Sequence, residues 1–476
     1  PGLGQTGERH TEEQIPCRME EEMNLKKSQQ AAFGLGAVGK DIVYMLISGY
    51  LLYYYNAVLG MNSVFIGTMM MAARIFDAIN DPIMGVIVAK TKTKWGRYRP
   101  WILTGTVLNA ITVYALFAVP DGMAGQSRKI WLTVFYLAWG VTSTLMDIPF
   151  WSMIPAITKP GKEREGLSSL ARSCAGIGDA IPTILTMVVV PVLSGGSVFA
   201  DYRIGFRIWA LIIAVFFVVS GVMTVPEKTV FTEEKAAGVK EMFTSLLKND
   251  QAMTIVISII LVYCAINIVG NLILYFFQYD VGDTGAYSIF VAVCFLAQVA
   301  AMAAIPVLRR RLNKKQMFLG SYILQIIGFL LILVMAFTHL YYRMTWAVLC
   351  IPGILVYVGY GMLNVLLTIC LSDSVDYGEW KNGTRDEAVI FSMQTFTVKL
   401  ASGLAVFMAG LILDWVHLDT GMILQTQETL TGLRLWMTIP SILLLIAGII
   451  FYKKRYRLDE ETMEEISAGL SEARRS

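Results

Sequence analysis

Several long stretches of this sequence contain no charged residue. Thr254 to Gln278 and Leu324 to Thr338 are both free of Asp, Glu, Lys and Arg. A helix that crosses a bilayer needs about 20 predominantly apolar residues, so stretches of this kind are long enough to span a membrane. Over the whole chain 16% of residues are charged and 55% are apolar, whereas roughly a quarter of the residues in a soluble domain are charged. The chain is therefore expected to be a membrane protein.

Twelve hydrophobic segments can be distinguished along the chain. They lie near residues 37–60, 63–89, 101–120, 129–157, 166–194, 204–225, 252–279, 284–308, 315–339, 344–372, 387–414 and 430–452. A polar stretch rich in Lys and Glu, 227–250, separates the first six segments from the last six. No strong sequence repeat relates the two sets. Segment number and linker position predict an all-α membrane protein with twelve transmembrane helices in two six-helix halves, the major-facilitator fold.

The sequence can be divided on this basis into five parts. They are a polar N-terminal tail, 1–30, an N-terminal half, 31–226, a cytoplasmic linker, 227–250, a C-terminal half, 251–452, and a cytoplasmic C-terminal tail, 453–476. The first tail lacks the apolar core of a secretory signal, and Met23 is expected to be the natural start. In the second tail, apolar residues at helical spacing predict a short amphipathic helix on the cytosolic side. These residues are Leu458, Met463, Ile466 and Leu470.

Lys and Arg residues gather in alternate loops. The loops after the second and eighth segments hold Lys90, Lys92, Lys94, Arg97, Arg99, Arg309, Arg310, Arg311, Lys314 and Lys315. The intervening loops, such as 59–62 and 279–284, are poor in basic residues. Because cytoplasmic loops carry an excess of Lys and Arg, both termini are predicted to lie in the cytoplasm. The chain is expected to be a multi-pass protein of the cell membrane.

Composition also argues against several functions. The net charge of +3 gives no reason to expect nucleic acid as a partner. The cysteines form no CxxC pair, and His10, His339 and His417 fall in a tail or near segment ends. A membrane-embedded hydrolase or metalloenzyme would use an intramembrane histidine as base or ligand. We therefore expect neither an enzyme nor a cofactor.

Charged residues nevertheless occur inside the predicted spans. They are Asp41, Arg74, Asp77, Asp81, Asp147, Arg172, Asp179 and Lys399. Each costs about 2.5–3.5 kcal/mol on insertion scales, so pairing, water or function must compensate. One explanation is a set of salt bridges that only hold the helices together. Acids outnumber bases and gather in the first half, which favours a functional role for the set.

Two of these acids share one helical face. Asp77 and Asp81 are four residues apart on the second segment, and Asn80 lies beside them. Two carboxylates this close in a medium of low dielectric repel each other. A bound Na⁺ or a shared proton would relieve the repulsion. The spacing therefore predicts a cation site.

A second stripe runs along the fourth segment. Thr144, Asp147 and Trp151 are separated by three and four residues, so they lie on one face. A carboxylate accepts hydrogen bonds from vicinal sugar hydroxyls, and an indole packs on the apolar face of a pyranose. Trp151 could instead anchor the helix at the membrane surface. Arg172 and Lys399 are the expected counter-charges, Arg172 for Asp147 and Lys399 as a contribution from the opposite half.

The motifs around these residues resemble those of the glycoside–pentoside–hexuronide:cation symporters, a family that includes the melibiose/sodium symporter. They are Arg74-Ile-Phe-Asp-Ala-Ile-Asn-Asp-Pro82, Lys94-Trp-Gly-Arg-Tyr-Arg-Pro100, Asp147-Ile-Pro-Phe-Trp-Ser152 and Asp373-Ser-Val-Asp-Tyr-Gly-Glu379. The similarity runs from about residue 31 to about residue 452 and covers nearly the whole membrane part. In combination these motifs are specific for the family.

The resemblance implies roles for individual residues. The positions that match the family's cation site, and so its Na⁺ ligands, are Asp77, Asn80, Asp81 and Thr144. The positions that match its sugar site are Lys40, Asp41, Asp147, Trp151 and Arg172, together with Gln394, Thr395 and Lys399 on the eleventh segment. Two positions depart from the melibiose symporter, because Ser143 replaces an aromatic residue and Asn364 replaces a tryptophan. Both departures would reshape a sugar pocket, so the resemblance implies the mechanism of this chain more firmly than the identity of its sugar.

The sequence thus predicts a secondary active transporter that couples the uptake of a glycoside, pentoside or hexuronide to Na⁺, H⁺ or Li⁺ by alternating access. The expected partners are a sugar, a cation and membrane lipids, for a chain that functions as a monomer. An uncoupled facilitator or a lipid-type carrier on the same fold is the main alternative. A transporter-like sensor is a further one, although the linker and tails offer no signalling domain.

Overall fold

The structure is a computed structural model that describes residues 25–158, 162–196, 201–223, 247–382, 387–422 and 424–473. Its helices are α2 (Lys27–Tyr53), η1 (Tyr54–Val58), α3 (Ser63–Lys90), α4 (Arg99–Phe117), α5 (Gly125–Ile157), α6 (Lys162–Leu193), α7 (Tyr202–Val222), α9 (Asp250–Tyr275), η2 (Phe276–Val281), α10 (Thr284–Leu308), α11 (Lys314–Thr338), α12 (Leu340–Arg343), η3 (Trp346–Leu349), α13 (Cys350–Asn382), α14 (Glu387–Trp415), α15 (Gln427–Arg455) and α16 (Glu460–Ala473). No strand is present in this part of the chain.

Twelve of these helices are long, and they coincide with the twelve predicted segments. Ten of them are long and apolar enough to cross a membrane, as judged over the described residues. The other two, α3 and α5, are the helices that carry Asp77, Asp81 and Asp147. A helix satisfies its own backbone hydrogen bonds, which a lipid-exposed chain must do. The predicted all-α architecture with twelve long helices is confirmed for the described part of the chain.

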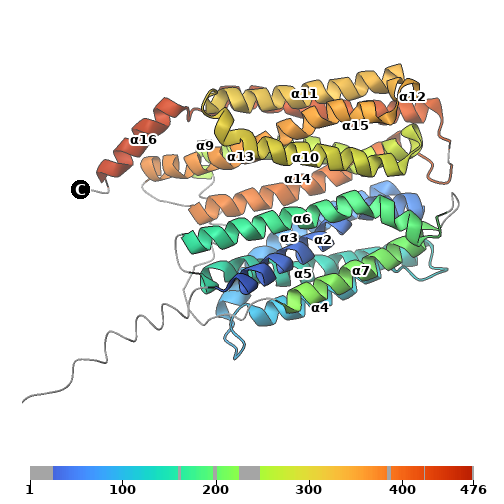
Figure 1. The fold of residues 1–476 in the computed structure, drawn as a ribbon, viewed down its shortest axis with the longest axis horizontal. Coiled ribbons are helices and arrows are strands. Elements are labelled where there is room, and N and C mark those ends of the chain that lie inside the picture. Colours follow the sequence, from blue (N-terminus) through green and yellow to red (C-terminus); the bar gives the residue numbers. More distant parts are fainter. Residues whose placement is uncertain are drawn as a thin grey trace, which may run out of the picture.

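The helices form two groups with the same packing pattern. In the first group α2 packs on α6 and α7, α5 packs on α3 and α4, and α4 packs on α7. In the second group α9 packs on α14 and α15, α13 packs on α10 and α11, and α11 packs on α15. Figure 1 shows the two groups as blue-to-green and yellow-to-red layers. The structure therefore contains the internal repeat that sequence comparison between the halves did not detect.

The two groups meet mainly along two pairs of helices, α3 with α14 and α6 with α10, with a smaller contact between α2 and α9. The hydroxyl of Ser63, at the start of α3, donates to the carbonyl of Gly410 near the end of α14 at 2.8 Å. The hydroxyl of Tyr275 donates to Oδ1 of Asn56 at 3.0 Å, also between the groups. These contacts lie at the end of the bundle opposite the basic loops. We call the two ends the basic end, which carries Lys90 and Arg309, and the opposite end.

A buried ion pair joins η2 to α15 at the opposite end. Arg434 donates to both oxygens of Asp280 at 2.7 Å, and Tyr341 donates to the same carboxylate at 2.9 Å. The two charged side chains are 3% and 0% exposed, so water cannot replace either partner. Removal of one partner would leave the other charge buried and uncompensated.

Arg434→Met is therefore expected to lower the free energy of unfolding by about 3–5 kcal/mol. Arg203→Met is the matched control, because Arg203 pairs with Asp201 on an exposed surface and should contribute about 1 kcal/mol or less. Unfolding of both purified variants in detergent measures the difference. Equal losses in the two variants would contradict the stabilising role of the buried pair.

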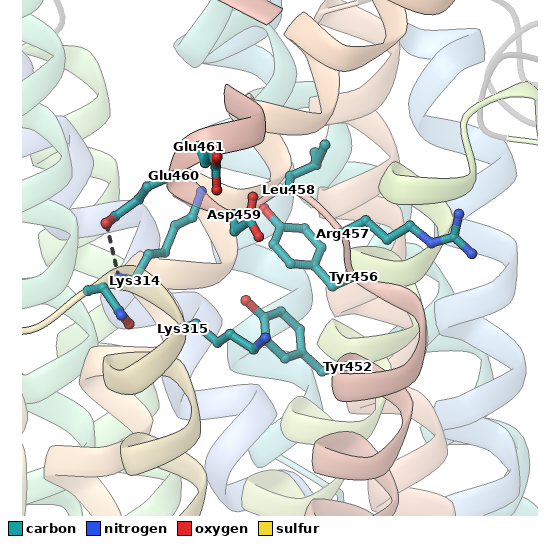
Figure 2. Close-up of a pocket in the computed structure, with 10 residues that line it drawn as sticks. Lys314, Lys315, Tyr452, Tyr456, Arg457, Leu458, Asp459, Glu460 and Glu461 are labelled. Atoms are coloured by element: carbon teal, nitrogen blue, oxygen red, sulfur yellow. Dashed lines mark hydrogen bonds between the residues drawn. The ribbon is translucent and has the colours of Figure 1, made fainter. Parts of the chain in front are cut away.

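The helix predicted in the C-terminal tail is present as α16, and it is attached to the second group at the basic end. Glu460 accepts from Arg309 at 2.6 Å and from the backbone N–H of Lys314 at 3.2 Å. Leu458 and Ile466 are buried against the bundle. Figure 2 shows Glu460 beside the start of α11, at the edge of a pocket of about 300 Å³. Ion pairs and apolar contacts together hold the tail in place.

Protonation should loosen this attachment. Hydrogen bonds from Arg309 and from the Lys314 backbone lower the pKa of Glu460 below its usual value. The contribution of Glu460 is therefore present at neutral pH and disappears as the pH falls through its lowered pKa. Glu460→Gln is expected to speed amide hydrogen exchange in α16 about 1.5- to 5-fold at neutral pH, the range for a surface ion pair. Glu461→Gln is the control, and equal exchange in the two variants would contradict the assignment.

Three of the sequence predictions lie largely or wholly outside the described residues. These are the polar tail up to residue 24, with Met23, and most of the linker 227–250.

Candidate functional site

The intramembrane charges lie near the middle of their helices. Asp41 is on α2, Asp77 and Asp81 on α3, Asp147 on α5 and Lys399 on α14. These helices pack on one another in the pairs α3 with α5 and α3 with α14. The charges therefore come to one depth of the bundle, and the site contains residues of both groups.

Asp81 is held from two other helices. The hydroxyl of Thr144 on α5 donates to Oδ1 of Asp81 at 2.9 Å. The ammonium of Lys399 on α14 forms an ion pair with Oδ2. Two residues assigned to the cation site, Asp81 and Thr144, are thus in contact. Lys399, expected on the sugar side, instead contacts the cation side, although it also lies within electrostatic range of Asp147.

Asp77 is almost fully buried, with 5% of its surface exposed. Its Oδ2 lies 3.7 Å from Arg74, one turn earlier on α3, whereas Oδ1 has no hydrogen-bond partner within the described structure. A Cβ atom at position 140 would lie 2.4 Å from Oδ1, so glycine at this position of α5 leaves room for the carboxylate as it is placed. An unpartnered buried carboxylate oxygen is a free position for a cation or a proton.

The predicted repulsion between the two acids is offset by one basic side chain from the same helix and one from α14. Arg74 accompanies Asp77, and its guanidinium lies 5.3 Å from the ring centres of both Tyr44 and Trp139. Lys399 accompanies Asp81. Two acids are therefore balanced by two bases. No group of three or more His, Cys, Asp and Glu side chains is placed to hold a metal ion in the part of the chain that the structure describes. A cation here would need further ligands from the half-buried Asn80, Thr144 or water.

A second charged group surrounds Lys40 on α2. Its ammonium lies 2.6 Å from Asp41 and 2.9 Å from Asp147, and 4.9 Å from the ring centre of Trp151. The indole N–H of Trp151 donates to Asp147 at 3.1 Å. The Asp147 side chain is still 40% exposed, so its carboxylate can accept hydrogen bonds from a ligand. The structure thus brings four of the predicted sugar-site residues together.

Arg172 takes a different part from the one expected. Its guanidinium stacks 4.1 Å from the ring centre of Trp151, and no ion pair joins it to Asp147 among the described residues. Lys40 supplies the counter-charge that the sequence assigned to Arg172. Trp151 lies between Lys40 and Arg172, which fixes the plane of its ring. Trp151 is therefore a residue of the charged site inside the bundle and does not have the position of an anchor at the membrane surface.

The second group contributes polar side chains at a similar depth. Gln394 on α14 donates to Thr368 on α13 at 3.1 Å, and Asn364 donates to Tyr263 on α9 at 3.0 Å. Thr395, on the same helix as Gln394, is exposed. Tyr263 and Thr368 were not predicted, because a lone Tyr or Thr in an apolar segment does not differ from an ordinary packing residue. No hydrogen bond that joins Gln394 to the Lys40 group is found in the described chain.

Comparison with known proteins places these features in context. The family described as MFS/sugar transport protein matches residues 32–460. A raffinose carrier protein of Pediococcus pentosaceus is 29% identical over 95% of this chain and 73% of its own length. An isoprimeverose transporter of Lactiplantibacillus pentosus is 27% identical over 90% and 88% of the two chains. The inner membrane symporter YicJ of Escherichia coli K12 is 24% identical over 95% and 96%.

Solved structures with the same fold are more distant in sequence. A bacterial homologue of the human lysosomal transporter Spinster, inward-facing and unoccupied, has a TM-score of 0.66 at 12% identity over 93% of this chain and 99% of its own. A proton-dependent oligopeptide transporter has a TM-score of 0.65 at 13% identity over 93% and 100%. At these identities the likeness concerns the fold alone.

Proposed function

This chain belongs to the MFS/sugar transport protein family, and from that premise we propose that it moves a sugar together with Na⁺, H⁺ or Li⁺ by alternating access. The relatives are sugar carriers, permeases and symporters rather than enzymes, so the chain is a multi-pass sugar transporter of the symporter type. The resemblance to the glycoside–pentoside–hexuronide:cation symporters is likewise confirmed. The coupling ion, its site and the transport cycle are the subject of the proposal.

The contact between Lys399 and Asp81 is the observation that carries the proposal. A cation that binds Asp77 and Asp81 must compete with the ammonium of Lys399, because both are attracted to the same carboxylate. Cation binding therefore releases Lys399 from Asp81. Asp147 attracts the released ammonium. Lys399 of the second group would then exchange Asp81 for Asp147, both in the first group. Such an exchange of contacts between the two groups fits alternating access, in which one group rocks against the other.

Thr144 connects the two sites along α5. Its hydroxyl is bonded to Asp81, while Asp147 lies on the same helix three residues later. A cation that orders Asp81 and Thr144 also orders the turn that presents Asp147 to the sugar. By linkage, the sugar strengthens cation binding by the same factor. This gives cotransport without a direct contact between sugar and cation.

The sugar is proposed to bind at Asp147 and Trp151. Asp147 accepts hydrogen bonds from adjacent hydroxyl groups, and Trp151 packs against the apolar face of the ring. Lys40, Asp41 and Arg172 hold these two side chains in position. Since the relatives are named for raffinose, isoprimeverose and lactose, the proposed substrates are glycosides with two or more sugar units.

The hydrogen bonds that join the two groups at the opposite end support a form closed on that side. The excess of Lys and Arg supports assignment of the basic end to the cytoplasm. We therefore propose that the chain lies in the cell membrane with both termini in the cytoplasm, and that the site of this form is reached from the cytoplasm. We further propose that the chain acts as a monomer.

Vesicles with an imposed ion gradient test the proposed function. Purified protein is reconstituted, and labelled raffinose, isoprimeverose and lactose are offered under a Na⁺, Li⁺ or H⁺ gradient. A symporter accumulates at least one sugar above its outside concentration, and a collapsed gradient stops the accumulation. Simple equilibration of a sugar under all three gradients would instead identify an uncoupled facilitator.

A further inference from the structure

Asp179 on α6 is an intramembrane acid that neither proposed site includes. Arg172 and Asp179 are seven residues apart on α6, so both lie on one face of that helix. The residue before Asp179, Gly178, packs against α2, where a Cβ atom at position 178 would lie 2.6 Å from the carbonyl of Val38 and 3.0 Å from Cβ of Asp41. Asp179 is thus beside the Lys40 group and interacts electrostatically with Asp41 and Lys40.

Asp179 differs from the other acids of the site in its partners. Asp81 pairs with Lys399, Asp77 faces Arg74, and Asp41 and Asp147 share Lys40. Within the described chain, no hydrogen bond or ion pair reaches the carboxylate of Asp179. Its own carbonyl accepts from Thr183 at 2.7 Å, a contact that involves the backbone alone.

The cation side and the sugar side of the site differ in net charge. The cation side has two acids and two bases, with no net charge. The sugar side has three acids, Asp41, Asp147 and Asp179, and two bases, Lys40 and Arg172. An unpaired carboxylate at this depth costs several kcal/mol, whereas a proton from the aqueous solution removes that cost. Lys40 cannot serve Asp179 while it holds the other two acids.

We propose that Asp179 carries a proton as part of the sugar site, and that the sugar binds to the protonated form. The proton gives the sugar side a net charge of zero, and the resulting hydroxyl can donate a hydrogen bond to a sugar oxygen. Loss of the proton leaves a third negative charge beside Asp41 and weakens sugar binding. This inference rests on the proposed sugar site, but it is independent of which cation binds at Asp77 and Asp81.

The charged groups on the helices that pack on α6 are consistent with a protonated Asp179. Helix α2 provides Lys40 and Asp41, and α5 provides Asp147. On α7 and α10 the residues at this depth are uncharged. Arg203 and Arg207 lie in the part of α7 at the opposite end of the bundle, and α10 has no charged residue from Thr284 to Leu308. Protonation of Asp179 therefore depends mainly on Lys40 and on the two acids that share it.

The test compares the wild-type chain with Asp179→Asn, which has the shape of a protonated aspartate and cannot titrate. Infrared spectra of the purified proteins, recorded from about pH 5 to about pH 9 without sugar, report the C=O stretch of protonated carboxyl groups. We expect a titrating band in the wild-type protein that is absent from Asp179→Asn. It should remain in Asp121→Asn, which alters an exposed loop acid. An identical band in the wild-type protein and Asp179→Asn would overturn the proposal.

Raffinose affinity over the same pH range provides the second readout. Wild-type affinity should fall by up to about tenfold per pH unit once Asp179 has lost its proton, whereas Asp179→Asn should lack this part of the pH dependence. An unchanged pH dependence in Asp179→Asn would overturn the role in sugar binding. If raffinose fails to bind to the wild-type protein at all, the proposed substrate is wrong, and the infrared band still decides whether Asp179 carries a proton.

Discussion

Asp77→Cys is expected to abolish the accumulation of sugar against its gradient while sugar binding and downhill transport remain. Asp77 has a buried carboxylate oxygen without a hydrogen-bond partner in the described structure, beside a glycine that leaves room for it. This oxygen is the free ligand for a coupling cation, and its loss leaves only Asp81, which Lys399 already holds. Uptake by vesicles with an imposed Na⁺ or H⁺ gradient measures the effect, and accumulation should fall to the equilibrium level.

Two controls separate loss of coupling from loss of folding. Asp77→Asn keeps the shape of the side chain and should give the same result, because the charge is the property that matters. Asp121→Cys changes an exposed loop acid and should accumulate sugar normally. Unfolding of each variant in detergent measures whether the protein stays folded once Arg74, which also contacts Tyr44 and Trp139, has lost Asp77. Full accumulation by Asp77→Cys would show that the cation binds elsewhere.

Asp147→Asn is expected to remove measurable sugar binding. The carboxylate is partly exposed, and an ammonium and an indole N–H hold it in place for hydrogen bonds with a ligand. A hydrogen bond to a charged group contributes about 1.5–3 kcal/mol, so the loss of two would weaken affinity by roughly two to four orders of magnitude. Titration calorimetry of the purified variant with raffinose or lactose measures this change.

Trp151→Phe is the graded comparison for Asp147→Asn. It keeps an aromatic ring for the sugar and for Arg172 but removes the N–H that holds Asp147. The loss should therefore be smaller, roughly tenfold or less. A sugar affinity that is unchanged in Asp147→Asn would rule out this carboxylate as the binding group, whatever the result for Trp151.

Much of the fold follows from apolar patterning alone, because a span needs a minimum length of apolar chain. The ends of the helices do not. Segments predicted near 129–157 and 166–194 begin earlier in the structure, at Gly125 and Lys162, because helices extend beyond the apolar layer into water. The ion pair of Asp280 and Arg434 was also missed. Both lie near segment ends, where a single sequence offers no sign that a charge is buried.

Within the site, relations along one helix were predictable and relations between helices were not. Helical spacing placed Asp77 with Asp81, and Thr144 with Asp147 and Trp151. The partners of these acids come from other helices, as Lys399 does for Asp81 and Lys40 does for Asp147. Their choice depends on how the helices pack, so the sequence assigned the counter-charge of Asp147 to Arg172. The structure also singles out Asp179, which the sequence only counted among the intramembrane acids.

Reciprocal binding measurements test the central claim, that the cation and the sugar bind to coupled sites, most directly. Sugar affinity is measured with and without the cation that drives accumulation, and cation affinity is measured with and without that sugar, on one purified preparation. The account predicts that each ligand strengthens the other by the same factor, on the order of 5- to 150-fold. A sugar affinity that does not change with Na⁺, Li⁺ or H⁺ would contradict it.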